Sequence, residues 1–348
     1  MGVTILRFVD LRSDTVTMPT PEMREAMYRA EVGDDVYGED PTVKRLEELG
    51  AQMTGKEASL FITSGTMGNQ LAILAHTQRG DEILCEAESH IFFYEVGGLA
   101  ALAGVQAKTI AGNQGILTSE LVKAAFRPQD IHQPRTALIC LENTHNRAGG
   151  MCYPIETLAA VYTLAREHTI PVHTDGARIF NAAIRHQVAI DKLTCYTDSV
   201  MFCLSKGLCA PVGSLLAGSR DFIEKCRRYR KMLGGGMRQA GIIAAAGLVG
   251  LSSMVERLNE DHANARKLAN AIANMEIGFD ASDVQTNIVV IDTVKIGKTA
   301  AELSSRFAEQ GIKISQFGDY KIRMVTHHGI ASDDIQYTID VMSRILKG

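Results

Sequence analysis

The sequence predicts an α/β fold, with a large domain on a mostly parallel sheet and a smaller C-terminal α/β domain. Three observations predict it. From residue 57 to about residue 218, short apolar segments alternate with helix-like segments, which is typical of parallel strands covered by helices on both faces. After about residue 250 the order changes to strand, helix, strand, strand, helix. The chain of 348 residues is also too long for one compact core.

Seven apolar segments are expected to form the strands of the large sheet. They are 58–62, 81–85, 105–109, 136–141, 171–175, 199–204 and 214–217. Helical patterns lie between them, for example at 69–76 and 155–167. The large domain is therefore expected to contain a seven-stranded, mostly parallel sheet.

A domain boundary is expected near residue 250, which assigns residues 1–250 to the N-terminal segment and large domain and 251–348 to the small domain. A long helix at 254–275 is expected to lead into the small domain. The elements that follow are a strand at 287–292, a helix at 299–310, strands near Lys313 and Ile322, and a helix at 333–346. Residues up to about Asp40 are rich in turn formers, and their pattern assigns them to neither domain.

The composition favours a small metabolite as the partner. The net charge is -4, and without a basic stripe the sequence does not favour nucleic acid or a membrane surface. Seven cysteines without a CxxC pair indicate reduced thiols in a cytoplasm and no metal site. Residues 1–10 are interrupted by Arg7 and Asp10 and predict no signal peptide. The longest apolar stretch, 240–251, is too short to cross a bilayer.

Two predicted strands end in side chains that can do chemistry. Asp175 ends the strand 171–175, and Lys206 follows the strand 199–204 almost directly. Ligands of open α/β sheets gather at the carboxyl ends of the strands. A lysine held there can act as a nucleophile toward an aldehyde. Taken singly, a lysine in the position of Lys206 is more often a surface residue, and Asp175 is as often a helix N-cap as a site residue.

A third feature is the turn at residues 63–69, TSGTMGN, which follows a strand and opens a helix. Small residues there expose backbone N–H groups, and the helix dipole favours an anion such as phosphate. A lysine for an aldehyde, an acid for a ring nitrogen and a phosphate turn are together what pyridoxal phosphate requires.

At these residues the sequence resembles the threonine aldolase family of fold-type I pyridoxal-phosphate enzymes, over nearly the whole chain. The matching blocks are LRSDT (11–15), GDDVYGED (33–40), SGTMGN (64–69), ENTHN (142–146), DGAR (175–178), LSKGL (204–208), GGGMRQ (234–239) and RMVTH (323–327). Their number and order make the resemblance far more specific than any single motif. One slight departure is Thr174, where the family often has an apolar residue.

The resemblance implies how the cofactor is held. Lys206 would be the Schiff-base lysine and Asp175 the partner of the pyridine nitrogen. Gly65 and Thr66 would hold the phosphate, with Arg238 reaching in from a neighbouring subunit of a homotetramer.

It also implies residues for the substrate. Ser13, Arg178 and Arg323 would bind the α-carboxylate, with Arg178 close to the cofactor as well. Tyr37 and Lys231 are further candidates near the substrate hydroxyl or the boundary between subunits.

The expected function is retro-aldol cleavage of L-threonine and L-allo-threonine to glycine and an aldehyde. His90 is implied to lie over the pyridine ring, and either His90 or His145 would take the proton of the β-hydroxyl group. The choice between these two histidines stays open. The alternatives on the same scaffold are a β-eliminating lyase, a racemase and a hydroxymethyltransferase. An alternative of another class is a non-catalytic cofactor-binding scaffold.

Overall fold

The computed structural model describes residues 8–128 and 130–347, in two compact units. The larger unit consists of Met18–Arg147 and Cys152–Val255. The smaller unit consists of the N-terminal residues up to Thr17, Ala148–Met151 and the chain from Glu256 onward. The first seven residues, on which the expectation about a signal peptide largely rests, lie outside the described residues.

The division differs from the expected boundary near residue 250, and it groups N-terminal residues whose domain the sequence pattern left open. The chain changes units between residues 255 and 256, five residues later than expected. The N-terminal residues up to Thr17 cluster with the C-terminal part and not with the large domain. Strand pairing explains this, because β1 (Val9–Asp10) lies parallel to β10 (Ile312–Lys313). Two residues carry too little pattern to be recognised as a strand.

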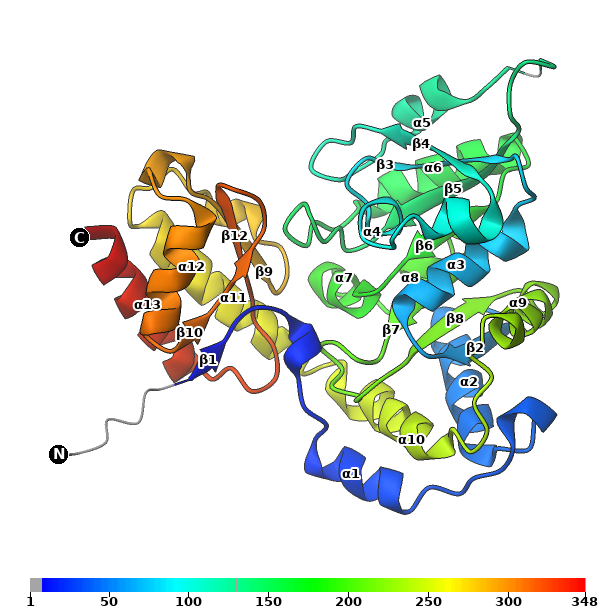
Figure 1. Ribbon diagram of the computed structural model, residues 1–348, viewed down its shortest axis with the longest axis horizontal. Coiled ribbons are helices and arrows are strands. Elements are labelled where there is room, and N and C mark those ends of the chain that lie inside the picture. Colours follow the sequence, from blue (N-terminus) through cyan, green and yellow to red (C-terminus); the bar gives the residue numbers. More distant parts are fainter. Residues whose placement is uncertain (1–7, 129, 348) are drawn as a thin grey trace. The chain divides into compact units, whose positions relative to one another are not determined.

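The larger unit contains a seven-stranded sheet, and six of its strands run in the same direction (Figure 1). In spatial order the strands are β2 (Ala58–Ile62), β8 (Ser214–Gly218), β7 (Ser199–Cys203), β6 (Val172–Asp175), β5 (Thr136–Glu142), β3 (Glu82–Glu86) and β4 (Gln106–Ile110). Only β8 is antiparallel to its neighbours. The expected mostly parallel α/β fold is confirmed, and each strand begins and ends within one residue of its expected position.

Helices cover both faces of this sheet. Those of the larger unit are α1 (Pro21–Tyr28), α2 (Pro41–Thr54), α3 (Gly65–His76), α4 (His90–Phe93), α5 (Ser119–Ala125), α6 (Ile155–Glu167), α7 (Ile179–His186), α8 (Asp191–Thr194), α9 (Arg220–Met232) and α10 (Gly241–Val249). Shorter helical turns are η2 (Asp35–Tyr37), η3 (Leu99–Ala103) and η4 (Gly250–Met254).

Alternation along the strands decides which helix meets which face. Met201 and Leu216 pack with residues of α3 and α9 in one buried cluster. Their neighbours Phe202 and Leu215 therefore point to the opposite face. There Phe202 meets Phe180 of α7, with ring centroids 5.4 Å apart, and Leu215 lies against α2. Helix α3 is thus fixed over the centre of the sheet, and its N-terminus lies at the carboxyl ends of the strands.

The N-terminal segment contains two helices that its turn-rich composition concealed. Thr20 caps α1 by accepting a hydrogen bond from the Met23 amide, and Pro21 follows as the first helical residue. Asp40 caps α2 in the same way, followed by Pro41. A polar cap followed by proline is a recognised helix start, so this signal was present in the sequence.

The smaller unit has its own sheet and core. The strands β11 (Ser315–Gln316), β12 (Lys321–Val325) and β9 (Ile288–Asp292) form an antiparallel sheet in that order. The helices are α11 (Leu258–Ala273), α12 (Ala300–Glu309) and α13 (Ser332–Lys347), with the short turns η1 (Asp14–Val16), η5 (Ala281–Asp283) and η6 (Val294–Ile296). Buried residues such as Leu303, Phe307 and Ile322 form one apolar cluster.

The long helix expected at 254–275 is shorter than expected, because α11 begins only at Leu258. Residues before it continue from α10 as the π-helical turn η4. In the described chain, no single helix is both long and apolar enough to span a membrane. One bent pair of helical segments, Gly241–Met254 and Leu258–Ala273, would together be long and apolar enough, a statement that rests on length and composition only.

Candidate active site

A cavity of about 190 Å³ lies at the carboxyl ends of the central strands of the larger unit. Its walls are Ser64, Gly65, Thr66, Asn69, His90, Glu142, Thr144, Asn146, Asp175, Ala177, Arg178, Met201, Cys203, Ser205 and Lys206. These residues come from β5, β6, β7 and the segments that directly follow them, and from the starts of α3 and α4. The position agrees with the rule that parallel sheets bind ligands at this edge.

The structure brings Lys206 and Asp175 into the wall of this one cavity. Asp175 is the last residue of β6, and Lys206 follows the adjacent parallel strand β7. The carboxylate of Asp175 is buried and accepts hydrogen bonds from Asn69 Nδ2, at 2.8 Å, and from the Ala177 amide, at 3.0 Å. An amine and a fixed buried acid therefore line the same small cavity.

The N-terminus of α3 forms another wall, with Gly65 and Thr66. Ser64 caps this 12-residue helix by accepting a hydrogen bond from the Met67 amide. A side chain at position 65 would place its Cβ only 3.0 Å from Cys203 Sγ, so glycine lets the helix start lie tightly against β7. The first amides of a helix have no partner within the helix, and the helix dipole favours an anion at this point.

His90 begins α4 and lines the same cavity. Its amide donates to Glu142 Oε2, and its Nδ1 lies 3.0 Å from Glu95 Oε1. Burial by itself lowers the pKa of His90, but the hydrogen bond to Glu95 and the charge of Asp175 outweigh it, so the pKa is raised. The imidazole is held in one orientation by a buried carboxylate.

Two buried acids near Asp175 were not among the expected site residues. Glu95 accepts hydrogen bonds from Asn69 and from Gln70 Nε2, at 2.7 and 2.6 Å. Burial raises the pKa of Glu142, although the charge of a neighbouring histidine and two backbone amides oppose the shift. Among the described residues, His90, Glu95 and Asp175 bring their ligand atoms within 4.8 Å of one another. The amide of Asn69 bridges the two acids of this group, and the expectation of no metal stays a prediction.

His145 does not line the cavity. It is buried, and its Nε2 lies 3.0 Å from Glu86 Oε2. Burial lowers the pKa of His145, but the hydrogen bond to Glu86 and the charge of Glu142 outweigh it and raise the pKa. In return, His145 helps to lower the pKa of Glu86 against the effect of burial. The two form a buried histidine–carboxylate pair.

The arginines expected at the substrate carboxylate lie in different units. Arg178 is buried in the cavity wall, directly before α7. Arg323 belongs to β12 of the smaller unit, where its Nη2 donates to the carbonyl of Arg12 at 3.1 Å. Ser13 follows in the same unit and caps the turn η1. Arg323 and Ser13 are thus brought together, and their part in substrate binding stays a prediction.

A second group of expected residues lies elsewhere on the larger unit. Within the described residues of this chain, Tyr37, Lys231 and Arg238 are not part of the wall around Lys206. All three are exposed, and Arg238 pairs with Asp34 at 2.9 Å. Lys231 lines a cavity of about 330 Å³ on α9. An exposed position is what residues offered to a neighbouring subunit require, and that role stays a prediction.

Sequence reasoning missed four polar residues that support the site. They are Asn69, Glu86, Glu95 and Glu142. Two of them, Asn69 and Glu142, stand in recognised blocks that also contain expected site residues, so their place in those blocks could have identified them. Glu95 stands in no block, and only its separation of five residues from His90 could have drawn attention to it.

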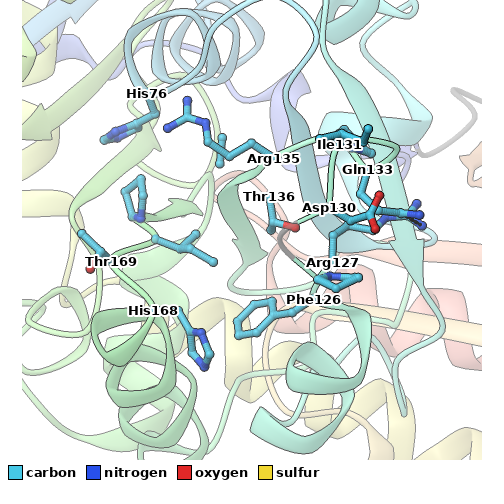
Figure 2. Close-up of a pocket in the computed structure, with 15 residues that line it drawn as sticks. His76, Phe126, Arg127, Asp130, Ile131, Gln133, Arg135, Thr136, His168 and Thr169 are labelled. Atoms are coloured by element: carbon cyan, nitrogen blue, oxygen red, sulfur yellow. Dashed lines mark hydrogen bonds between the residues drawn. The ribbon is translucent and has the colours of Figure 1, made fainter.

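The larger unit has a bigger cavity, of about 660 Å³, at the amino ends of β5 and β6. Figure 2 shows His76 and Arg135 on one side of it and Phe126 and His168 on another. Arg135 is paired with Asp81 at 2.6 Å, and Phe126 contacts the ring of His168. None of the site residues expected from the sequence lines it.

Comparison with known proteins identifies the family of this chain. Residues 10–295 match the beta-eliminating lyase family. The low-specificity L-threonine aldolase 1 of Arabidopsis thaliana is 44% identical over 98% of this chain and 97% of its own length. This chain belongs to the beta-eliminating lyase family and, within it, to the threonine aldolases. The family predicted from the sequence is therefore confirmed.

Other relatives extend the comparison. The low specificity L-threonine aldolase of Escherichia coli (strain K12) is 43% identical over 94% of this chain and 96% of its own. Among solved structures, Leishmania major threonine aldolase is similar with a TM-score of 0.81 at 17% identity, covering 97% of this chain and 99% of its own. A serine palmitoyltransferase from Sphingomonas wittichii has a TM-score of 0.76 at 15% identity, covering 98% and 88%. At these identities the structural likeness shows the fold.

Proposed function

We propose that this lyase cleaves L-threonine and L-allo-threonine to glycine and acetaldehyde, with pyridoxal 5'-phosphate as its cofactor. One observation carries the proposal: Lys206, Asp175 and the N-terminus of α3 line a single cavity. The relatives named low-specificity L-threonine aldolase support the substrate class.

The residues of the cavity fit this cofactor. Lys206 supplies an amine for its aldehyde, and the buried acid Asp175 suits a protonated ring nitrogen. Gly65 and Thr66 stand at a helix start where a phosphate is favoured, and a Cβ at position 65 would crowd Cys203. When bound there, the cofactor would act as an electron sink for the substrate's Cα.

The chain's own residues would then orient the amino acid. We assign the α-carboxylate to Arg178, with Arg323 and Ser13 as the partners expected from the smaller unit. Two donors from a guanidinium group fix a carboxylate in one plane, which aligns the Cα–Cβ bond for cleavage. His90 would lie against the ring, where Glu95 fixes its Nδ1.

His90 is the preferred base for the β-hydroxyl proton, because it lines the cavity and His145 does not. Taking that proton at Nε2 would leave a charged imidazolium whose Nδ1–H points at Glu95. The carboxylate then stabilises the charge as it forms. His145 with Glu86 stays the alternative base.

Several finer features belong to the same proposal. We propose a cytoplasmic homotetramer in which Arg238, Tyr37 and Lys231 of one subunit complete the site of another. Their exposed positions support this arrangement. A small amino acid is the proposed partner, and neither nucleic acid nor a membrane is expected to be one.

The second candidate function is β-elimination, which the name of the matching family favours. On threonine, elimination would release water and finally give 2-oxobutyrate and ammonia, whereas retro-aldol cleavage gives glycine and acetaldehyde. Racemisation would leave the carbon skeleton intact, and hydroxymethyl transfer would need added folate.

The test is product analysis with L-threonine and L-allo-threonine offered separately, without folate. We expect glycine and acetaldehyde in equal amounts from protein that turns yellow with the cofactor. Borohydride should attach the cofactor covalently to Lys206, as peptide mapping would show. Protein that stays colourless would favour the non-catalytic scaffold. Coloured protein that forms 2-oxobutyrate would favour the β-eliminating lyase.

A further inference from the structure

A chain of hydrogen-bonded side chains connects Asp175, at the carboxyl end of β6, with the amino ends of β6 and β7. Its members, in order from Asp175, are Asn69, His173, Ser199 and His76. Asn69 Nδ2 lies 2.8 Å from Asp175 Oδ2, and Asn69 Oδ1 lies 3.0 Å from His173 Nε2. His173 Nδ1 and His76 Nε2 each lie 2.9 Å from Ser199 Oγ. Every link has ordinary hydrogen-bond length.

The periodicity of the elements explains why these side chains meet. His173 and Asp175 are two residues apart in β6, so both point to the face that carries α3. Ser199 of β7 is paired in register with His173. Asn69 and His76 are seven residues apart in α3, which places them on one side of the helix, two turns apart. Helix α3 therefore supplies both Asn69, next to Asp175, and His76, at the far end of the hydrogen-bonded side chains.

The direction of the first hydrogen bonds follows from Asn69. Its Nδ2 lies 2.7 Å from Glu95 Oε1 and 2.8 Å from Asp175 Oδ2. Facing two carboxylates, this end of the amide must be the NH₂ group, since an oxygen there would have only acceptors around it. The amide oxygen then faces His173, so His173 Nε2 must carry a hydrogen and donate it.

The remaining links follow in the same sense. Burial lowers the pKa of His173 to about 4 and that of His76 to about 3, so both rings are neutral near pH 7. A neutral His173 that carries its proton on Nε2 has an acceptor at Nδ1, which Ser199 Oγ–H fills. The oxygen of Ser199 then accepts from His76 Nε2–H. Stacking on Phe222, with ring centroids 4.5 Å apart, holds the His76 ring in place.

We propose that His76, Ser199, His173 and Asn69 act as positioning residues for Asp175, through a chain in which every proton points toward its carboxylate. Hydrogen bonds aligned in one direction polarise one another, so the last donor to the acid is stronger than an isolated amide. The proposal rests on the proposed function in one respect, namely that Asp175 faces the ring nitrogen of the cofactor.

The outer end of the chain is more accessible than the rest. Asn69, His173 and Ser199 are buried, whereas His76 is partly exposed and lines the larger cavity (Figure 2). Substitutions at His76 therefore test the chain with the least risk to folding.

The direct test is neutron diffraction from the cofactor-loaded protein after exchange into deuterium oxide. We expect deuterium on Nε2 of both His76 and His173, none on their Nδ1 atoms, and the Ser199 hydroxyl directed at His173. A proton on Nδ1 of either ring would overturn the proposal. A neutron map of the cofactor-free protein would show the same proton positions, so the test holds even if the proposed cofactor does not bind.

The functional test is the rate at which the loaded protein releases its cofactor, followed by the loss of visible absorbance. Ser199→Ala removes the central link and should speed release on the order of fivefold, the effect of about one hydrogen bond. The matched control is Thr174→Val on the neighbouring strand, because this buried hydroxyl donates to Thr197 and lies outside the chain. Both variants should lose similar thermal stability, but only the first should release the cofactor faster.

Rescue by a conservative variant separates positioning from packing. His76→Gln keeps an N–H donor at similar reach and should release the cofactor like the unchanged protein. His76→Leu keeps the bulk without the donor and should release it about twofold to threefold faster. Equal release from these two variants, or from Ser199→Ala and Thr174→Val, would overturn the proposal. Failure of unchanged protein to take up cofactor would instead count against the proposed function.

Discussion

The two cavities of the larger unit differ in a way that size does not reveal. The cavity at the amino ends of the strands has about 660 Å³, against about 190 Å³ for the one around Lys206. In the larger one, Arg135 is well exposed and meets a single acid, Asp81. In the smaller one, Asp175 and Glu142 are buried in one wall.

This difference shows what marks a functional site in this fold. Burying a charge costs free energy unless partners compensate, so buried acids that line a cavity mark a candidate site. At the larger cavity the buried acids Asp81 and Glu82 are each paired with an arginine, Arg135 and Arg127, so these charges imply no ligand. The smaller cavity is therefore the place where substitutions should matter, and four predictions test the contrast.

The largest effect is expected for Lys206→Ala. Without the amine, the protein should lose covalent attachment of the cofactor and reduce kcat on the order of 10³-fold or more. The fold should be retained, because Lys206 lies in a cavity wall and not in the apolar core. Borohydride trapping and steady-state kinetics measure both effects. Trapping that persists would assign the attachment to another lysine.

Asp175→Asn is expected to be the next most damaging change. The substitution keeps the shape but removes the charge, and its NH₂ group must face one of two donors, Asn69 Nδ2 or the Ala177 amide. We expect kcat to fall by about 10²-fold and the cofactor to bind more weakly. Equilibrium titration of the cofactor together with kcat checks this. Unchanged affinity would mean that the acid does not face the ring.

A pair of substitutions identifies the base. Glu95 helps to raise the pKa of His90, and Glu86 helps to raise that of His145. A base works unprotonated, so activity rises with pH through its pKa. Removing the carboxylate lowers that pKa and moves the acid limb to lower pH, by about one unit.

For His90 as the base, Glu95→Gln should shift the acid limb of kcat/KM while Glu86→Gln leaves it in place. The reverse result would make His145 the base. Profiles of kcat/KM against pH for the two variants, run beside the unchanged protein, decide between them.

The smallest effect is expected at the larger cavity. Arg135→Ala removes the exposed partner of the buried acid Asp81, which keeps its hydrogen bond from the Gln78 amide, and should cost about 1–3 kcal/mol of unfolding free energy. Urea denaturation measures this cost, and kcat should stay within about twofold of its original value. A marked loss of activity would mean that the two cavities are not as different as their charges indicate.

Much of the fold was predictable because its signals are local. Most strands of the large sheet are short apolar segments bounded by turn formers, and a buried strand needs little more than that; β4 (QAKTI), at the sheet edge, and β6 (VHTD) are more polar. Lys206 and Asp175 were found for a related reason. Each stands at the end of such a strand, and parallel strands bring their carboxyl ends to one edge.

The family was also predictable, since ordered blocks of sequence identify it without coordinates. The same blocks could not tell that His145 lies outside the Lys206 cavity while His90 lies in its wall. His145 stands in a recognised block and His90 was named through the resemblance, and neither signal reports which side chain faces a cavity.

By itself, the sequence determined the succession of strands and helices along the large domain, the two chemical groups at the strand ends and the family. Only the tertiary structure decided that the N-terminal residues up to Thr17 join the C-terminal unit. It also decided that Asn69 bridges Asp175 and Glu95, and that Glu86 supports His145. These contacts join residues 26 to 106 positions apart. Periodicity reports only the face on which a side chain lies, whereas its partner is chosen by packing between distant elements.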